Sequence, residues 1–207
     1  MNIAFSIETL TSGCEVDETW AATFEQRWVC KDCRKLDRRC RGNGYDVVLS
    51  TRPRYGAMDW AVGPVGTYSL IHRSFAELLT AGVTHDLVFG RVFLGDGVEL
   101  KDYATYLGQK PIPIRGTSGS YRRQCKDCGS FIYSAGYSWY VARHALRALE
   151  LYELDAGRLL VVDEARLKRI DRKRWKGIRI QKLPLVDEPQ DGIAEFPDNW
   201  YYRGVPS

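Results

Sequence analysis

The alternation of apolar and polar residues predicts a chain made largely of short strands. Residues 3–8 alternate well enough to form an opening strand. Further strands are expected at residues 45–51, 68–71, 87–94, 103–107, 131–133, 159–162 and 178–185, with a shorter one near Trp60. Glycine and proline interrupt most of the remaining chain, which indicates loops at residues 52–66 and 95–119 around those strands.

Helical spacing is confined to a few segments. Phe75, Leu78 and Leu79 share one face of a helix, with Ser74 as its N-cap and Gly82 at its C-terminal end. Asp163 is expected to cap a helix over residues 164–175.

Two other segments are ambiguous. Residues 142–152 contain helix formers, although residues 151–154 also fit the start of a strand. Trp20, Phe24 and Trp28 recur every four positions, which fits either a helix or an aromatic strand.

The order strand, helix, glycine, strand occurs twice, at residues 68–94 and 159–185. Gly82 and Gly177 are 95 positions apart (177 − 82). We therefore expect an α+β fold with mixed or antiparallel sheets and a few helices. The chain is expected to form one compact domain, 1–207, with two β-α-β-like halves at 28–94 and 122–186. Because glycines often end helices, chance remains an alternative explanation of the match.

Composition places the chain among ordinary globular proteins. Of its 207 residues, 44% are hydrophobic and 27% are charged, and the formal net charge is only +4. No apolar run is long enough to span a membrane, and the first residues do not have the pattern of a signal peptide. We expect a cytoplasmic protein with no membrane partner, in which cysteines bind metal rather than form disulfides.

The tetrapeptide Cys-Lys-Asp-Cys occurs at residues 30–33 and again at 125–128, and the two copies also lie 95 positions apart (125 − 30). Such pairs place two sulfurs on one side of a tight turn, and two pairs complete a tetrahedral zinc site. Cys30, Cys33, Cys125 and Cys128 are therefore predicted to bind one structural Zn²⁺ per chain, as a split zinc ribbon that joins the halves. Two alternatives remain: a ligand set that joins Cys14 or Cys40 to the first pair, and a redox-active Cys-Lys-Asp-Cys.

No catalytic motif accompanies the cysteines. His72, His85 and His144 are scattered without metal or triad spacing, and we find no nucleophile signature and no phosphate-binding glycine loop. We therefore expect a protein that is not an enzyme. Basic residues cluster at 34–41 and 168–182, so a zinc ribbon that binds nucleic acid is the competing interpretation. The small net charge favours a solvated surface instead.

Several segments together resemble the double-CXXCG motif paralogous family of myxobacteria, which is related to immunity proteins of polymorphic toxin systems. The similarity extends over residues 28–186 and departs from the family motif at Arg34, where the family has glycine. The residues that carry it are Cys30 to Cys33, Cys125 to Gly129, Tyr68 to Val83, Leu159 to Glu164, Gly177-Ile178 and Leu183 to Leu185.

The resemblance implies a protein that binds a cognate toxin and blocks it, with zinc holding the fold. Its recognition surface would then lie in the loop-rich segments 34–44 and 95–120 and in the C-terminal tail. A sequence pI near 8.7 argues against a basic nuclease toxin as the target.

Overall fold

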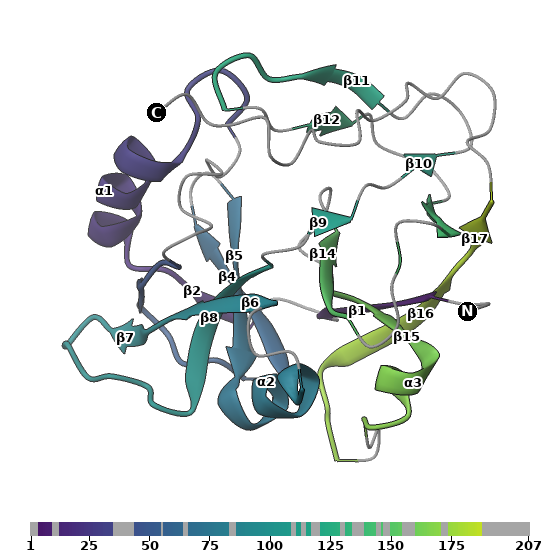
Figure 1. The fold of residues 1–207 in the computed structure, drawn as a ribbon. Coiled ribbons are helices and arrows are strands. Elements are labelled where there is room, and N and C mark those ends of the chain that lie inside the picture. The colour runs from purple at the N-terminus through teal and green to yellow at the C-terminus, as the bar shows by residue number, and fades with distance from the viewer. Residues whose placement is uncertain are drawn as a thin grey trace.

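The computed structural model describes residues 4–9, 13–34, 44–54, 56–63, 66–82, 86–108, 111–112, 115–116, 121–128, 131–133, 139–143, 146, 150–154, 160–170 and 174–187. Within them the chain has the α+β fold that the sequence predicts, with mixed and antiparallel sheets and few helices (Figure 1). Residues 35–43 of the predicted loop-rich segment 34–44 lie outside these residues, as do His85, His144, Cys40 and the tail from 188.

The helices are α1 (Glu18–Trp28), α2 (Arg73–Thr80) and α3 (Glu164–Leu167). The strands, in chain order, are β1 (Ala4–Thr9), β2 (Cys14–Glu15), β3 (Val47–Leu49), β4 (Met58–Gly63), β5 (Gly66–His72), β6 (Leu87–Gly90), β7 (Val92–Leu94), β8 (Tyr103–Gly108), β9 (Pro111–Ile112), β10 (Arg115–Gly116), β11 (Tyr121–Gln124), β12 (Phe131–Tyr133), β13 (Trp139–Ala142), β14 (Tyr152–Leu154), β15 (Leu160–Asp163), β16 (Ile178–Leu183) and β17 (Leu185–Val186).

Two five-stranded sheets have the same construction. One has the order β2-β4-β5-β8-β6 and the other the order β9-β14-β15-β1-β16. In each sheet the first pair is parallel and the other three are antiparallel. Each also has a parallel strand pair outside it, β3 with β7 in one case and β13 with β17 in the other.

The correspondence extends to the residue register of the sheets. Ile71 lies opposite Ala104 in the first sheet, and Val162 lies opposite Phe5 in the second. Adding 91 (162 − 71) to the β5 residue and subtracting 99 (104 − 5) from the β8 residue converts each pair of the first sheet into a pair of the second. Leu70↔Thr105 becomes Val161↔Ser6, and His72↔Tyr103 becomes Asp163↔Ala4. The repeated order that the sequence shows is therefore a repeated topology, and it begins at β1 and β8.

The fourth strand of each sheet comes from the opposite half of the chain. Strand β1 precedes the first set of elements but lies between β15 and β16, whereas β8 precedes the second set but lies between β5 and β6. The two halves thus exchange their first strands reciprocally, and neither sheet is complete without the other half.

A shared apolar core packs between the two halves. It includes Ile7 from β1, Ile71 from β5, Phe75 from α2 and Val162 from β15, all of them buried. A second core, which contains Phe24 of α1 with Tyr68 and Leu70 of β5, joins the first sheet to α1 and to the β3-β7 pair. The four cysteines that form CxxC pairs make a third cluster, separate from both cores.

Helix starts are set by side-chain caps. The Asp17 carboxylate accepts a hydrogen bond from the Trp20 N–H and caps α1. Trp20, Phe24 and Trp28, whose spacing fits either a helix or a strand, therefore lie on a helix. His72 Nδ1 accepts from the Ser74 N–H, which makes His72 the N-cap of α2 in place of the predicted Ser74. Asp163 caps α3 as predicted, and it holds the sheet position that corresponds to His72.

Some predicted boundaries are wrong. Helix α3 ends at Leu167 rather than at Trp175, because the bonds Arg169 N–H to Arg166 and Ile170 N–H to Leu167 tighten the chain into i→i+3 turns. The predicted strand 87–94 divides at Arg91, and the predicted strand 178–185 divides at Pro184, which has no N–H to donate. In the ambiguous segment 142–152, the described residues 142, 143, 146 and 150–152 are not α-helical, and β14 begins at Tyr152. No described helix has the length and apolar character to cross a membrane.

Candidate metal centre

The first cysteine pair comes directly after helix α1. The helix stops at Val29, which is extended, and its N–H still bonds the Glu25 carbonyl at 3.1 Å. Cys30 comes next, and a tight turn brings the chain to Cys33. The turn is closed by the Arg34 N–H, which donates to the Cys30 carbonyl at 2.9 Å.

The turn requires a left-handed backbone after its second cysteine. Arg34 has φ +58°, the only positive φ of a non-glycine residue among the described residues. Such a conformation brings Cβ close to the backbone and costs about 1–2 kcal/mol for an L-residue. A glycine at this position would avoid that cost.

The second cysteine pair lies at the tip of a β-hairpin. Strands β11 and β12 pair in antiparallel fashion, with Gln124 opposite Phe131. Cys125 comes immediately after β11, and the turn through residue 127 leads to Cys128. One pair thus succeeds a helix and the other closes a hairpin, although both have the same sequence.

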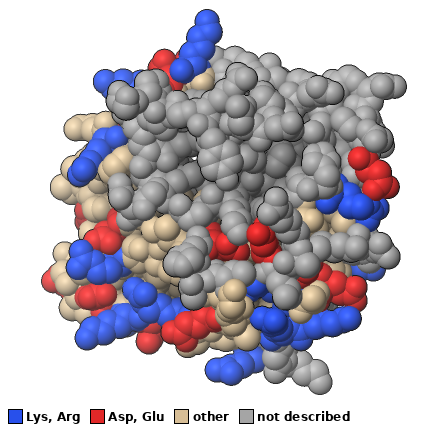
Figure 2. Space-filling model, in the orientation of Figure 1, with Lys and Arg blue, Asp and Glu red and all other residues tan. Residues whose placement is uncertain are grey.

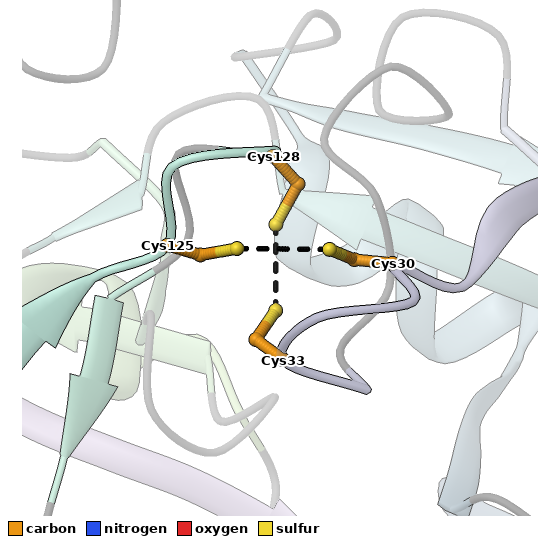
Figure 3. Close-up of side chains that lie close together, drawn as sticks. All are labelled: Cys30, Cys33, Cys125 and Cys128. Atoms are coloured by element: carbon orange, nitrogen blue, oxygen red, sulfur yellow. Dashed lines mark hydrogen bonds between the residues drawn. The ribbon is translucent and has the colours of Figure 1, made fainter.

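The four sulfurs converge on one point (Figure 3). The Cys30 and Cys125 sulfurs are 3.6 Å apart, those of Cys33 and Cys128 are 3.4 Å apart, and all four lie within 4.8 Å of one another. A tetrahedron with metal–sulfur bonds of about 2.3 Å has edges of about 3.8 Å. Two of the sulfur–sulfur separations are therefore slightly shorter than such an edge, and the whole cluster is compact enough to surround one tetrahedral ion.

The pairs that approach most closely join equivalent positions of the two tetrapeptides. Cys30 meets Cys125 and Cys33 meets Cys128, each partner 95 positions away. The site lies where the two topologically equivalent halves meet, and each half supplies two of the four thiols.

The protein environment shifts the pKa values of two of these thiols in opposite directions. Burial opposes the charge on Cys30, yet N–H groups of Cys33 and Asp32 and contacts with the other sulfurs outweigh it, so the pKa of Cys30 is lowered. Burial raises the pKa of Cys125 to about 11, with help from the Asp32 carboxylate. The Cys125 thiol donates to Asp32 Oδ2 at 3.2 Å, a bond that is lost when a metal displaces its proton.

The donor set fits a closed metal site. Cys30, Cys125 and Cys128 are buried and Cys33 is half-buried, and no other group of three or more metal-ligating side chains was found among the described residues. Four thiolates fill a tetrahedral shell and leave no position for water or substrate, which is the pattern of structural rather than catalytic sites. The two turns carry exposed residues of both signs, the cations Lys31, Arg34 and Lys126 and the carboxylates Asp32 and Asp127.

Of the other sequence candidates, Cys14 and His72 lie among the described residues, and neither is brought to this site. Cys14 is buried in the core of the first sheet, and burial, followed by the charge of Asp59, raises its pKa to about 12. This thiol therefore takes no part in the four-cysteine cluster. His72 caps a helix and packs against Tyr103 and Trp175.

Two contributors to the site could not be found from the sequence pattern alone. Asp32 approaches Cys125 across 93 positions, and no local signal indicates that contact. The strained backbone at Arg34 could have been inferred from the sequence, because glycine follows the second tetrapeptide, at Gly129, whereas arginine follows the first. No protein-family profile and no curated protein sequence matches this chain.

Proposed function

We propose that Cys30, Cys33, Cys125 and Cys128 bind one structural Zn²⁺ and that the zinc-stabilised protein is an immunity protein, which binds and neutralises a cognate bacterial toxin without catalysing a reaction. The observation that carries the zinc assignment is the convergence of four sulfurs from two tetrapeptides 95 positions apart. Thiolates survive as ligands in a reducing compartment, which supports a cytoplasmic protein.

Zinc suits this donor set because it has no redox chemistry and accepts tetrahedral thiolates without geometric penalty. Tetrahedral sulfur sites also take iron, so the metal needs direct measurement. Elemental analysis of freshly purified, reduced protein should give one zinc per chain. A red protein with one iron would contradict the zinc assignment, and a metal-free folded protein would contradict the site.

Toxin neutralisation is supported by the resemblance to the double-CXXCG family and by a closed metal site that offers no open coordination position for chemistry. A stoichiometric inhibitor needs an exposed complementary surface rather than a catalytic pocket.

Co-expression tests this role. The product of the reading frame next to the gene should be toxic when expressed alone and harmless when this protein is present. Cys125→Ser should lose the protection because it opens the metal site, whereas Cys14→Ser, in a separate core, should retain it. If no neighbouring product is toxic and rescued, the proposed role is wrong.

Nucleic-acid binding is the weaker candidate function. Over the described part of the face in Figure 2, basic and acidic side chains are interspersed. Within the basic stretch 168–182, Lys168 pairs with Glu164 at 3.2 Å and Arg179 pairs with Glu8 at 2.5 Å. Binding to DNA or RNA that weakens steeply with salt would support this alternative over toxin neutralisation.

A further inference from the structure

A groove lies between helix α1 and the chain segment that leads into β3. Its volume is about 360 Å³, and its walls include Trp20, Phe24 and Trp28 from the helix and Tyr45 from the facing segment. Trp20 and Trp28 are half-buried, whereas Phe24 and Tyr45 are buried. The first cysteine pair begins two residues after Trp28, so the metal site fixes one end of the groove.

Three of the aromatic walls, Trp20, Phe24 and Tyr45, belong to one cluster of packed rings. Trp20 stacks on Phe24 with ring centroids 4.7 Å apart, and Phe24 contacts Tyr45 at 5.3 Å and Tyr68 at 5.4 Å. A preformed aromatic groove loses little conformational entropy when it is filled. It is therefore ready to accept an apolar side chain.

Two charged side chains line the groove, Arg27 and Asp46. Asp46 lines the groove, but its carboxylate accepts hydrogen bonds from the N–H, Nε and an Nη of Arg91. Burial opposes the charge of this carboxylate, yet the contact with Arg91 outweighs burial and lowers the pKa of Asp46. Arg27 is exposed, and its guanidinium lies 4.8 Å from the centre of the Trp28 ring. Among the described residues no carboxylate forms an ion pair with Arg27. The groove therefore presents one uncompensated cation beside its aromatic walls.

We propose that this groove is the docking site for an acidic segment of a protein partner, which inserts one apolar or aromatic side chain between Trp20, Trp28 and Tyr45 and places a carboxylate on Arg27. Tryptophan, tyrosine and arginine around a concave site are the residues that dominate protein–protein binding energy. Nucleic acid fits less well because its binding depends on several phosphate contacts, and the described rim offers one free cation.

The identity of the partner as a toxin depends on the proposed function, whereas the groove itself can be tested without a toxin. The probe is a blocked tripeptide, acetyl-Glu-Trp-Glu-amide, added to the full-length metal-loaded protein labelled with ¹⁵N. Amide shifts should move in α1 and at residues 44–46, and acetyl-Lys-Trp-Lys-amide should bind at least fivefold more weakly. Shifts that cluster elsewhere, or equal binding of the two peptides, would overturn the proposal.

A charge reversal on a matched pair isolates the groove. Arg27→Glu should lower the affinity for the acidic peptide about five- to tenfold, since it replaces a favourable contact at the rim of the groove with a repulsive one. Arg174→Glu is the control, because Arg174 is also exposed and lies 5.2 Å from the ring of the next residue, Trp175, in the other half of the chain. If Arg174→Glu has the same effect, the binding reflects net charge and the groove is not the site.

The neighbouring toxin then supplies a second measurement. Arg27→Glu should reduce its affinity while zinc content and the circular dichroism spectrum stay unchanged. If no toxin exists but the acidic peptide maps to the groove, the proposed function fails and the docking site stands. If neutralisation holds but Arg27→Glu and Thr23→Tyr, which fills the groove, leave it unchanged, the docking site is wrong. A single-stranded oligonucleotide that displaces the peptide would also overturn the choice of a protein partner.

Discussion

At the scale of single residues, the two Cys-Lys-Asp-Cys turns differ in the residue that comes after the second cysteine. This residue is Arg34, with its φ of +58°, in the first turn and Gly129 in the second. The backbone at Arg34 is left-handed although arginine does not suit that conformation, because the converging sulfurs and the Arg34 N–H bond to Cys30 fix the turn. A strained residue is tolerated when the surrounding structure determines its conformation.

Arg34→Gly should therefore stabilise the folded protein by about 0.5–1 kcal/mol, since glycine adopts positive φ without a Cβ clash but has more entropy to lose on folding. Denaturant unfolding of the zinc-loaded protein measures the change. Arg34→Ala is the matched control, because it removes the side chain but keeps Cβ. If both variants shift stability equally, the effect comes from the charge and not from φ.

Cys14 provides a second test at this scale. Because burial and then Asp59 raise its pKa to about 12, the thiol is almost entirely protonated at pH 8, and the thiolate is the reactive form. Iodoacetamide at pH 8 should leave Cys14 unmodified in the native protein and modify it after unfolding, as peptide mass spectrometry would reveal. Rapid native labelling of Cys14 would show that this part of the core opens readily.

At the scale of elements, the second half closes the end of helix α2. Arg166 is almost fully buried, and its guanidinium donates to the Leu79 carbonyl in the last turn of α2. Arg169 donates to the Ala81 carbonyl at 3.2 Å. Cations at a helix C-terminus satisfy carbonyls that lack intrahelical partners and interact favourably with the helix dipole. Burial, with the nearby charge of Arg169, lowers the pKa of Arg166, although an arginine remains charged.

Arg166→Met should destabilise the protein by about 3–5 kcal/mol, because it leaves the buried carbonyl of Leu79 and the nearby Asp86 and Asp163 without their cation. Arg169→Met removes an exposed donor from the Ala81 carbonyl and should cost no more than about 1 kcal/mol. Thermal and denaturant unfolding would measure both. Equal losses would show that the buried position of Arg166 is not what matters.

Most strands could be predicted because alternation of apolar and polar residues is a local signal. Strands β1, β5, β8 and β12 appear where that signal lies. The missed features are boundaries at which side-chain packing, rather than apolar spacing, decides the structure. The N-cap of α2 is His72, whose ring also rests against Trp175 about 100 positions away (175 − 72 = 103). The helical spacing of Leu167 and Ile170 predicts a longer α3. Both residues are indeed buried, but a turn after Leu167, rather than a continued helix, brings Ile170 into the core.

At the scale of the whole molecule, the sequence predicts the four-cysteine cluster and the repeated order of elements but not the exchange of first strands. The spacing of the cysteines is a local feature of the sequence. Which strand becomes the fourth of each sheet, β1 or β8, depends instead on tertiary packing, because each strand buries its side chains against one of the two sheets. Both strands are apolar enough for either sheet. Nothing within residues 4–9 identifies β15 and β16 as their partners.

Metal removal should loosen one region and leave the shared core intact, because the cysteine cluster is separate from the core that joins the halves. In the chelated protein, amide exchange in β11 and β12 should accelerate at least tenfold, whereas exchange in β1 should change little. Hydrogen-exchange mass spectrometry on zinc-loaded and chelated protein tests this. Equal loss of protection in β1 would mean that the metal supports the entire fold, as it does in small zinc domains.

The strand exchange has a consequence for how the protein is made. On the ribosome, β1 is synthesised long before β15 and β16. The Glu8 carboxylate of β1 accepts a hydrogen bond from Arg179, which is 171 positions later in the chain. Between the end of β8 and the end of β16 lie 75 residues (183 − 108), which take about 4–15 s to translate. Strand β1 thus has no native partner until β15 has been synthesised and is paired on both edges only after β16, so the second sheet is complete only when nearly all the described chain has emerged. Native contacts so distant along the sequence make slow folding and dependence on chaperones the expected behaviour of the nascent chain.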